Sequence, residues 1–246
     1  MYHYIYDTFL AQRSYRETLA RLETRLTDLG INGKIGRLTM LQNIRELIRE
    51  GVRKGSRTIV VCGNDTTIFR ALTTIIDEGV ALGIVPFGEP STVAAALGIP
   101  HGVAAAETLS ERLLKRLDVG IVNDTAYFLR DCTASLPQVP LECNQQYRLT
   151  PLGRTLDLTI TNLPSGTGAS LHSSSPVDGI LDTFIAHRSF LRKGTPETYI
   201  PTTHLTIPSE RPFPLTLDGW NTVTTPATIE VMPQLLRVIV GKKRNF

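Results

Sequence analysis

Two turn-rich stretches of the chain contain residues that could bind a phosphate. Residues 63–67 (GNDTT) directly follow a β-branched run at Thr58–Cys62 and lead into a segment with helical periodicity. A turn between a strand and a helix leaves backbone N–H groups free at the positive end of the helix dipole, where an anion binds well. Asp65, the negative charge of this turn, could hold Mg²⁺ or accept a proton from an attacking hydroxyl. An ordinary turn, with Asp65 or Thr66 as the helix N-cap, is the alternative.

The second stretch repeats this pattern about twenty residues later. An apolar run ends at Pro86, Gly88 and Glu89 supply a turn, and a short helical segment begins at Ser91. Loops at the same end of neighbouring parallel strands could hold one polyphosphate from both sides. Ser91 and Thr92 are also favourable N-cap residues, so a purely structural role would account for them equally.

Two Asp-Gly pairs provide further acidic candidates in the second half. Asp178-Gly179 and Asp218-Gly219 each have the composition of a hairpin turn. The sequence contains no GxSxG elbow and no GxxxxGK[ST] loop, so neither a hydrolase triad nor a P-loop is indicated. Its 5 histidines and 3 cysteines show no metal-ligand or CxxC spacing, so they identify no metal site.

Composition excludes several classes of protein. The 246 residues include 26 Lys+Arg and 23 Asp+Glu, a net charge of +3 that is too balanced for a dedicated nucleic-acid binder. The basic cluster Lys242–Arg244 is typical of a solubilising tail. No apolar stretch approaches the roughly 18 residues of a transmembrane helix, and no secretory signal is visible. We therefore expect a reduced, cytoplasmic protein that can be oligomeric.

Strands and helices alternate in the first half, which predicts βαβ units and a mostly parallel sheet. A capping-box spacing from Ser14 to Glu17 predicts a helix that ends near Gly30. A second helix is expected to place Leu41, Ile44, Leu47 and Ile48 on one apolar face. The remaining elements are strands at 4–6, 34–38, 58–62 and 81–85 and helices at 67–78, 91–97 and 107–116.

Short β-branched runs separated by Pro and Gly dominate the second half, which predicts an antiparallel sandwich or barrel. The expected strands are 125–129, 155–161, 180–186, 204–207, 228–231 and 235–240. The sequence thus predicts an α/β domain at 1–116 and an all-β domain at 117–240, with a tail at 241–246 that can pack back on the first domain.

The order of these motifs resembles the catalytic domain of the diacylglycerol kinase and bacterial lipid kinase family, whose core is related to NAD kinase. That family has a GGDGT loop and then a PxGTxNdfAraLGIP segment. Here the loop is Gly63-Asn64-Asp65-Thr66-Thr67, and the segment is 86–100 (PFGEPSTVAAALGIP). Leu217-Asp218-Gly219 is similar to the start of the family's later DGE motif, and residues 176–182 (PVDGILD) resemble its acidic turn.

The resemblance implies a Rossmann-like nucleotide-binding domain followed by an antiparallel β-sandwich that binds the acceptor. It implies ATP phosphates held by the two loops, Mg²⁺ bridging the phosphates, and attack by a lipid hydroxyl on the γ-phosphoryl group. Carried over in this way, Asp65 and Asp218 are the catalytic candidates. The cofactor-binding candidates are Gly63, Asn64, Thr66, Thr67, Pro86, Gly88, Glu89 and Ser91.

Four positions depart from the family pattern. Asn64 and Thr66 replace two loop glycines, and a β-branched Thr66 would tolerate a positive φ badly. Glu89 stands where the family has a threonine, so it would repel a phosphate unless Mg²⁺ lies between them. Trp220 replaces the glutamate of DGE and cannot accept a proton. Arg70 and Arg154 are the nearest candidates to neutralise phosphate charge.

These observations predict a lipid kinase-like protein that transfers a phosphoryl group from Mg-ATP to a lipid such as diacylglycerol, reached at the membrane surface. A family member that has lost transfer and binds a nucleotide, lipid or partner protein is the alternative. NAD kinase-like transfer to a nucleotide is a third reading, which the Leu217–Gly219 turn and the β-domain pattern disfavour.

Overall fold

The computed structural model describes residues 1–150, 155–164, 174–187, 197–244 and 246, and these form two compact units. The first contains Met1–Leu117 and Leu235–Phe246. The second contains Asp118–Pro164 and the described part of Ala169–Gln234. Among the described residues, no helix is long and apolar enough to cross a membrane.

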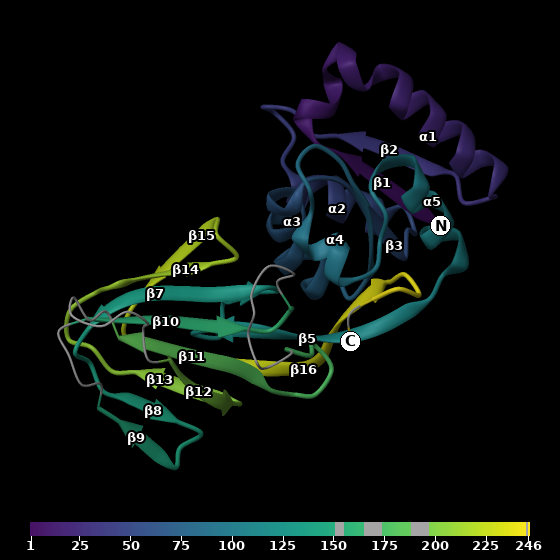
Figure 1. Ribbon diagram of the computed structural model, residues 1–246. Coiled ribbons are helices and arrows are strands. Elements are labelled where there is room, and N and C mark those ends of the chain that lie inside the picture. Colours follow the sequence, from purple (N-terminus) through teal and green to yellow (C-terminus); the bar gives the residue numbers. More distant parts are fainter. Residues whose placement is uncertain (151–154, 165–173, 188–196, 245) are drawn as a thin grey trace. The chain divides into compact units, whose positions relative to one another are not determined.

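A parallel sheet forms the centre of the first unit (Figure 1). Its strand order is β2 (Gly33–Arg37), β1 (Tyr2–Tyr6), β3 (Thr58–Gly63), β4 (Ala81–Pro86) and the end of β16 (Ala227–Ile239). Residues of β3 and β4 are buried almost throughout, as their continuous apolar sequence predicts for strands covered on both faces. Because the strands are parallel, the turns that follow β1, β2, β3 and β4 share one edge of the sheet.

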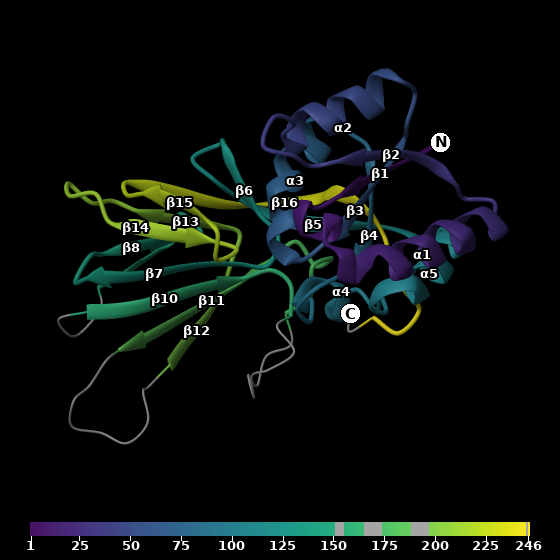
Figure 2. The same ribbon diagram turned by 90° about the horizontal axis from the view of Figure 1, so that it is seen from above.

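Helices cover both faces of this sheet. Figure 2 shows α2 (Ile44–Arg53) and α3 (Asp65–Asp77) on one side, and α1 (Arg16–Asp28) and α5 (Ala105–Glu111) on the other. Leu22, Ile48 and Ile68 represent the apolar stripes that these helices bury against the sheet. The shorter elements are α4 (Thr92–Ala96) and the 3₁₀ turns η1 (Thr8–Ala11), η2 (Arg13–Tyr15) and η3 (Gly102–Ala104).

The second unit is built from antiparallel strands that enclose an apolar core. One sheet has the order β12-β11-β10-β7-β14-β15, and the rest of the unit contains β5, β6, β13, β8, β9 and the start of β16. The bounds are β5 Leu114–Val122, β6 Ala126–Phe128, β7 Asp131–Pro137, β8 Leu141–Cys143, β9 Tyr147–Leu149, β10 Thr155–Thr161, β11 Leu181–His187, β12 Glu197–Thr202, β13 His204–Ile207, β14 Pro214–Leu217 and β15 Asn221–Thr224. The expected architecture, a Rossmann-like α/β domain followed by an antiparallel β-sandwich domain, is confirmed.

Several element boundaries differ from the sequence prediction. Ser14 is not the N-cap of α1, because a 3₁₀ turn precedes this helix and no side chain caps it. The helix expected at 107–116 ends at Glu111, because Arg112 adopts a left-handed conformation (φ 52°), and β5 then begins. Leu41 is exposed and lies outside α2, which begins at Ile44.

The strands expected at 228–231 and 235–240 form one long strand, β16. We expected residues 235–240 in the second domain, whereas the structure groups Leu235–Phe246 with the first unit. The reason is that Val238 pairs in parallel with Leu82 of β4, and Gly241 donates a hydrogen bond to the Leu97 carbonyl (2.9 Å).

Candidate functional site

The two turns singled out from the sequence lie side by side at the carboxyl edge of the parallel sheet. β3 ends at Gly63 and β4 at Pro86, and these two residues are paired in register. The Phe87 N–H donates to the Gly63 carbonyl at 2.9 Å, so the backbones of the two turns are joined directly.

The Asp65 side chain fastens the first turn to the second. Its Oδ2 accepts from the Thr92 N–H (2.9 Å) and the Thr92 hydroxyl (2.7 Å), and its Oδ1 accepts from the Ser91 hydroxyl. A charged acceptor strengthens each of these bonds. Asp65 therefore has a definite positioning role, since its carboxylate fixes the start of α4 against the start of α3.

Asn64 is the N-cap of α3. Its extended backbone (φ −96°) and its Oδ1, which accepts from the Thr67 N–H at 3.1 Å, are those of a capping residue. Because the helix begins at Asp65, Thr66 lies in the first helical turn and does not need the positive φ that its glycine counterpart suggested. The expected strain at Thr66 is therefore absent.

Asp7, which the sequence analysis did not single out, completes this corner. It follows β1 at the same sheet edge, and its Oδ2 accepts a hydrogen bond from the Thr67 hydroxyl. A Cβ on Gly63 would come within 2.7 Å of Thr67 Oγ1 and 3.2 Å of the Asp7 Cβ, so only glycine fits there. Its place directly after the first strand is the signal that could have identified Asp7.

The N-terminus of α3 keeps backbone donors available. Thr67 and Ile68 donate their N–H groups to Asn64, but within the described part of the chain no acceptor binds the N–H groups of Asp65 and Thr66. This 13-residue helix concentrates its positive dipole end at those two groups. An anion could therefore bind at this end of α3.

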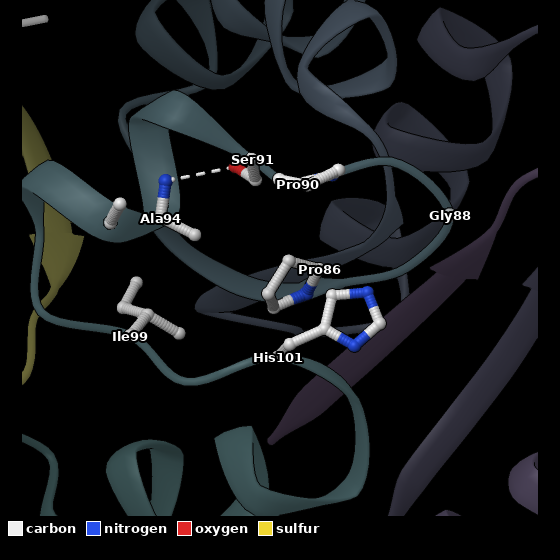
Figure 3. Close-up of a pocket in the computed structure, with 8 residues that line it drawn as sticks. Pro86, Gly88, Pro90, Ser91, Ala94, Ile99 and His101 are labelled. Atoms are coloured by element: carbon white, nitrogen blue, oxygen red, sulfur yellow. Dashed lines mark hydrogen bonds between the residues drawn. The ribbon is translucent and has the colours of Figure 1, made fainter. Parts of the chain in front are cut away.

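A mostly apolar cavity of about 340 Å³ adjoins the second turn (Figure 3). Its polar groups are the Ser91 hydroxyl and the exposed His101 imidazole, and Figure 3 shows that ring beside Pro86. Three of the predicted cofactor-binding residues, Pro86, Gly88 and Ser91, line it. The other lining residues, which were not predicted as site residues, are Pro90, Ala94, Ala95, Ile99 and His101.

Aromatic rings pack against the second turn. Phe87 is buried and packs edge-on against Tyr15 and His101, with ring centroids 6.2 Å apart in both pairs. Gly88 adopts φ +83°, a conformation that favours glycine, and a Cβ there would lie 3.4 Å from the Phe9 ring. Phe9, Tyr15 and His101 therefore all lie beside the second turn.

Glu89 is exposed at the tip of this turn, and within the described residues no hydrogen bond or ion pair engages its carboxylate. The same part of the chain holds no group of three or more His, Cys, Asp or Glu side chains that could bind a metal by themselves. Arg70 is exposed on α3, and Arg154 lies outside the described residues.

Asp218 is buried in the second unit, in the turn that joins β14 to β15. Its Oδ1 accepts from the N–H groups of Arg130 (2.7 Å) and Asp131 (3.1 Å), and its Oδ2 from that of Leu129 (2.9 Å). Burial raises the pKa of this carboxyl to about 7, although these hydrogen bonds oppose the shift. The arrangement fits a structural role better than that of an accessible base.

The comparisons agree with these features. The diacylglycerol kinase catalytic domain family matches residues 2–122. A probable lipid kinase YegS-like of Klebsiella pneumoniae is 32% identical over 91 residues, which cover 35% of this chain and 30% of that protein. An uncharacterized protein of Synechocystis is 23% identical over 118 residues, 48% of this chain and 27% of that protein. The matched stretches therefore span less than a third of these curated relatives.

Solved structures resemble the whole chain in fold. A diacylglycerol kinase from Bacillus anthracis has a TM-score of 0.82 at 16% identity and covers 98% of this chain and 97% of its own. An NAD kinase from Archaeoglobus fulgidus in complex with ATP has a TM-score of 0.64 at 14% identity and covers 99% and 95%. Residues 2–122, which contain the joined strand-end turns, thus match the diacylglycerol kinase catalytic-domain family, and the chain as a whole shares the fold of these solved kinases.

Proposed function

We propose that the protein is an ATP-dependent lipid kinase that transfers the γ-phosphoryl group of Mg-ATP to a lipid hydroxyl such as that of diacylglycerol. The observation that carries this proposal is that Asp65 fastens two strand-end turns beside the N–H groups of Asp65 and Thr66, which bind no acceptor among the described residues. The match of residues 2–122 to the diacylglycerol kinase catalytic domain supports the class of reaction, and the start of α3 would receive the phosphates.

The residues present fit the phosphates of a nucleotide. The N–H groups of Asp65 and Thr66 would donate to phosphate oxygens, and the dipole of α3 would favour their charge. Gly88 gives the second turn, which would face the phosphates, its positive φ. We assign the cavity beside Ser91 and His101 to an apolar part of a bound substrate.

Magnesium fits as a companion of the nucleotide. Mg²⁺ usually keeps several waters and is bound by one or two carboxylates together with substrate phosphates, so it does not need a cluster of protein ligands. Glu89 would be its side-chain ligand, because its carboxylate is exposed at the turn and engaged by no described residue. Bound there, the ion would neutralise negative charge that develops on the phosphates.

The chain's own residues would act mainly by positioning. Phosphoryl transfer depends on alignment and charge neutralisation more than on covalent chemistry of the protein. Asp65 would hold the two turns at a fixed separation, and Asn64 would fix the start of α3. Trp220 cannot take a proton from the acceptor hydroxyl, and Asp218 is enclosed by backbone donors. Phosphoryl transfer would therefore be slow, because neither residue is available as a base for the acceptor hydroxyl.

A second candidate function is nucleotide or lipid binding without transfer. It is favoured by the bonding of Asp65 and Asp218 within the protein and by Trp220 in place of the expected glutamate.

Transfer of labelled γ-phosphate from Mg-ATP to diacylglycerol in mixed micelles separates the two candidates. We expect labelled product and a rise in melting temperature at millimolar Mg-ATP. A melting shift without product would favour the binding protein. The absence of both signals would exclude a phosphate site. If the missing base limits the rate, Trp220→Glu should increase transfer, whereas the matched control Trp220→Gln should not.

A further inference from the structure

Two large apolar side chains are fully exposed next to each other on the first unit. Met40 and Leu41 have relative exposures of 104% and 93%, the highest of the exposed large hydrophobic residues among those described. Single exposed apolar residues are common on protein surfaces, whereas an exposed apolar cluster marks a contact with another molecule or a membrane.

The segment Thr39–Asn43, here called the apolar tip, is an ordered turn. Thr39 Oγ1 accepts from the N–H groups of Leu41 (3.2 Å) and Gln42 (3.1 Å). The tip is anchored at both ends, because Leu38 before it and Ile44 after it are buried. All five residues between these anchors are exposed. The hydrogen-bonded turn therefore keeps the side chains of Met40 and Leu41 exposed to solvent.

The apolar tip lies at the edge of the sheet that carries the candidate site. It follows β2, which runs parallel to β1, and β1 runs parallel to β3 (Figure 1). The Leu38 N–H donates to the Tyr6 carbonyl at 2.9 Å, one residue before Asp7. The carboxyl ends of β1, β2, β3 and β4 therefore present the tip and the two turns on the same side of the first unit.

Two arginines flank the apolar tip, and Glu46 follows the second of them in the first turn of α2. Arg37 and Arg45 flank it and are both exposed, and the segment between them contains no Asp or Glu. A pair of apolar side chains framed by cations matches an anionic bilayer, in which the apolar groups enter the acyl boundary and the cations meet the headgroups. An acidic protein surface would satisfy the arginines but would offer no apolar layer for Met40 and Leu41.

We propose that the apolar tip inserts Met40 and Leu41 into the surface of an anionic lipid bilayer and so holds the carboxyl edge of the first unit at the membrane. This inference rests on the proposed function, since a lipid acceptor would be reached at that surface. It assigns the contact to a segment outside the two turns of the candidate site.

A fluorescent side chain at the tip tests insertion directly. Trp220 is the sole tryptophan, so Leu41→Trp in a Trp220→Phe background reports on the tip alone. Its emission should shift to shorter wavelength, and quenching by acrylamide should fall, on addition of vesicles that contain phosphatidylglycerol. Unchanged emission and quenching would overturn the proposal.

Vesicle sedimentation gives the second measurement. The wild-type chain should bind phosphatidylglycerol vesicles more tightly than phosphatidylcholine vesicles, and M40S/L41S should bind at least about tenfold more weakly. Tyr147→Ser, which removes an exposed side chain from β9 of the second unit, is the matched control and should bind like the wild type. Equal binding by M40S/L41S and wild type would overturn the proposal. So would a self-associated wild type that M40S/L41S converts to a monomer, since the tip would then contact a second copy.

The two proposals fail separately. The M40S/L41S variant should keep the melting shift with Mg-ATP and its transfer to a short-chain, water-dispersed diacylglycerol, and should lose transfer to long-chain lipid in vesicles. If the wild type transfers no phosphate but inserts its tip, the kinase proposal fails and the membrane contact stands. If transfer occurs and the tip does not insert, the reverse holds.

Discussion

Asp65 shows how one carboxylate can connect two sequence motifs. It lies in the first turn, and its hydrogen-bond partners Ser91 and Thr92 lie after the second, 26 and 27 residues later. The sequence offered Asp65 as an N-cap, a metal ligand or a base. In the structure Asn64 is the cap, and Asp65 binds the start of α4 instead.

Replacement of Asp65 by asparagine should separate the two turns. The amide keeps one acceptor oxygen, so either the Ser91 or the Thr92 partner loses its bond, and we expect unfolding free energy to fall by about 1–3 kcal/mol. The melting shift with Mg-ATP should fall as well, because the turns are no longer fixed. Urea unfolding and thermal shift measure the two effects. Asp77→Asn, on the exposed end of the same helix, is the control, and equal behaviour of the two variants would contradict this role.

Asp218 is a second carboxylate whose bonds are internal, and it should make stability depend on pH. Its pKa is raised to about 7 by burial, so the folded state holds the proton more tightly than the unfolded state. Its contribution is therefore fully present below the ordinary carboxyl range and is lost as pH rises through about 7.

Asp218→Asn should remove that decline between pH 5 and pH 8, because an amide does not ionise in this range. It should also lower stability at every pH by about 1–3 kcal/mol, since its NH₂ group would face the N–H of Leu129, Arg130 or Asp131. Urea midpoints across the range test this against Asp124→Asn, an exposed control in another turn. A variant with the wild-type pH profile would disprove the assignment.

At the scale of elements, α3 depends on its cap for the shape of the candidate site. Asn64 satisfies the Thr67 N–H and leaves those of Asp65 and Thr66 for a ligand. Glycine occupies the equivalent family position, so this chain has exchanged a flexible residue for a capping side chain.

Asn64→Ala should cost about 0.5–2 kcal/mol of unfolding free energy, whereas Asn64→Ser, which can still cap, should cost much less. Thermal unfolding of both variants with and without Mg-ATP provides the measurement. If alanine and serine were equally destabilising, the loss would come from packing, and the capping role would be wrong.

At the scale of the whole molecule, the chain returns to its first unit after the β-rich second unit. Leu236, Val238 and Val240 are buried there, and the Val240 N–H donates to the Leu113 carbonyl at 2.9 Å. Residues 236–240 are therefore part of the first unit's core, although they are more than a hundred residues from its other strands.

A chain that ends at Gln234 should lose most of the stability of the first unit. Four buried apolar side chains, each worth about 1.5–3 kcal/mol, would be missing, and β4 would lose the strand that pairs with Leu82. Urea unfolding followed by circular dichroism should show a free energy of unfolding that is lower by several kcal/mol. A chain that ends at Arg244 should unfold like the wild type. Unchanged unfolding of the shorter chain would show that β16 is dispensable for the first unit.

The alternation of apolar strands with amphipathic helices predicted the parallel sheet, because strands buried on both faces need continuous apolar runs such as 58–62. The Leu41 prediction was wrong because the helical spacing of apolar residues continues backward past Asn43, whereas the Asn43 side chain caps the N-terminus and α2 begins at Ile44. The spacing of apolar residues gives no information about which side chain caps a helix. The single strand β16 was divided in two because Pro233 and Gln234 interrupt its pattern, and pairing with different neighbours holds the two halves in one strand.

The sequence by itself determined the fold family, the two turns and the residue types that depart from the family, because these depend on local order along the chain. The tertiary structure decided what those residues bind. The contacts of Asp65 with Thr92, of Asp7 with Thr67 and of Asp218 with Arg130 join residues that are 27, 60 and 88 positions apart. Spacing along a chain cannot encode such contacts, since they exist only once parallel strands and hairpins bring distant turns to the same place.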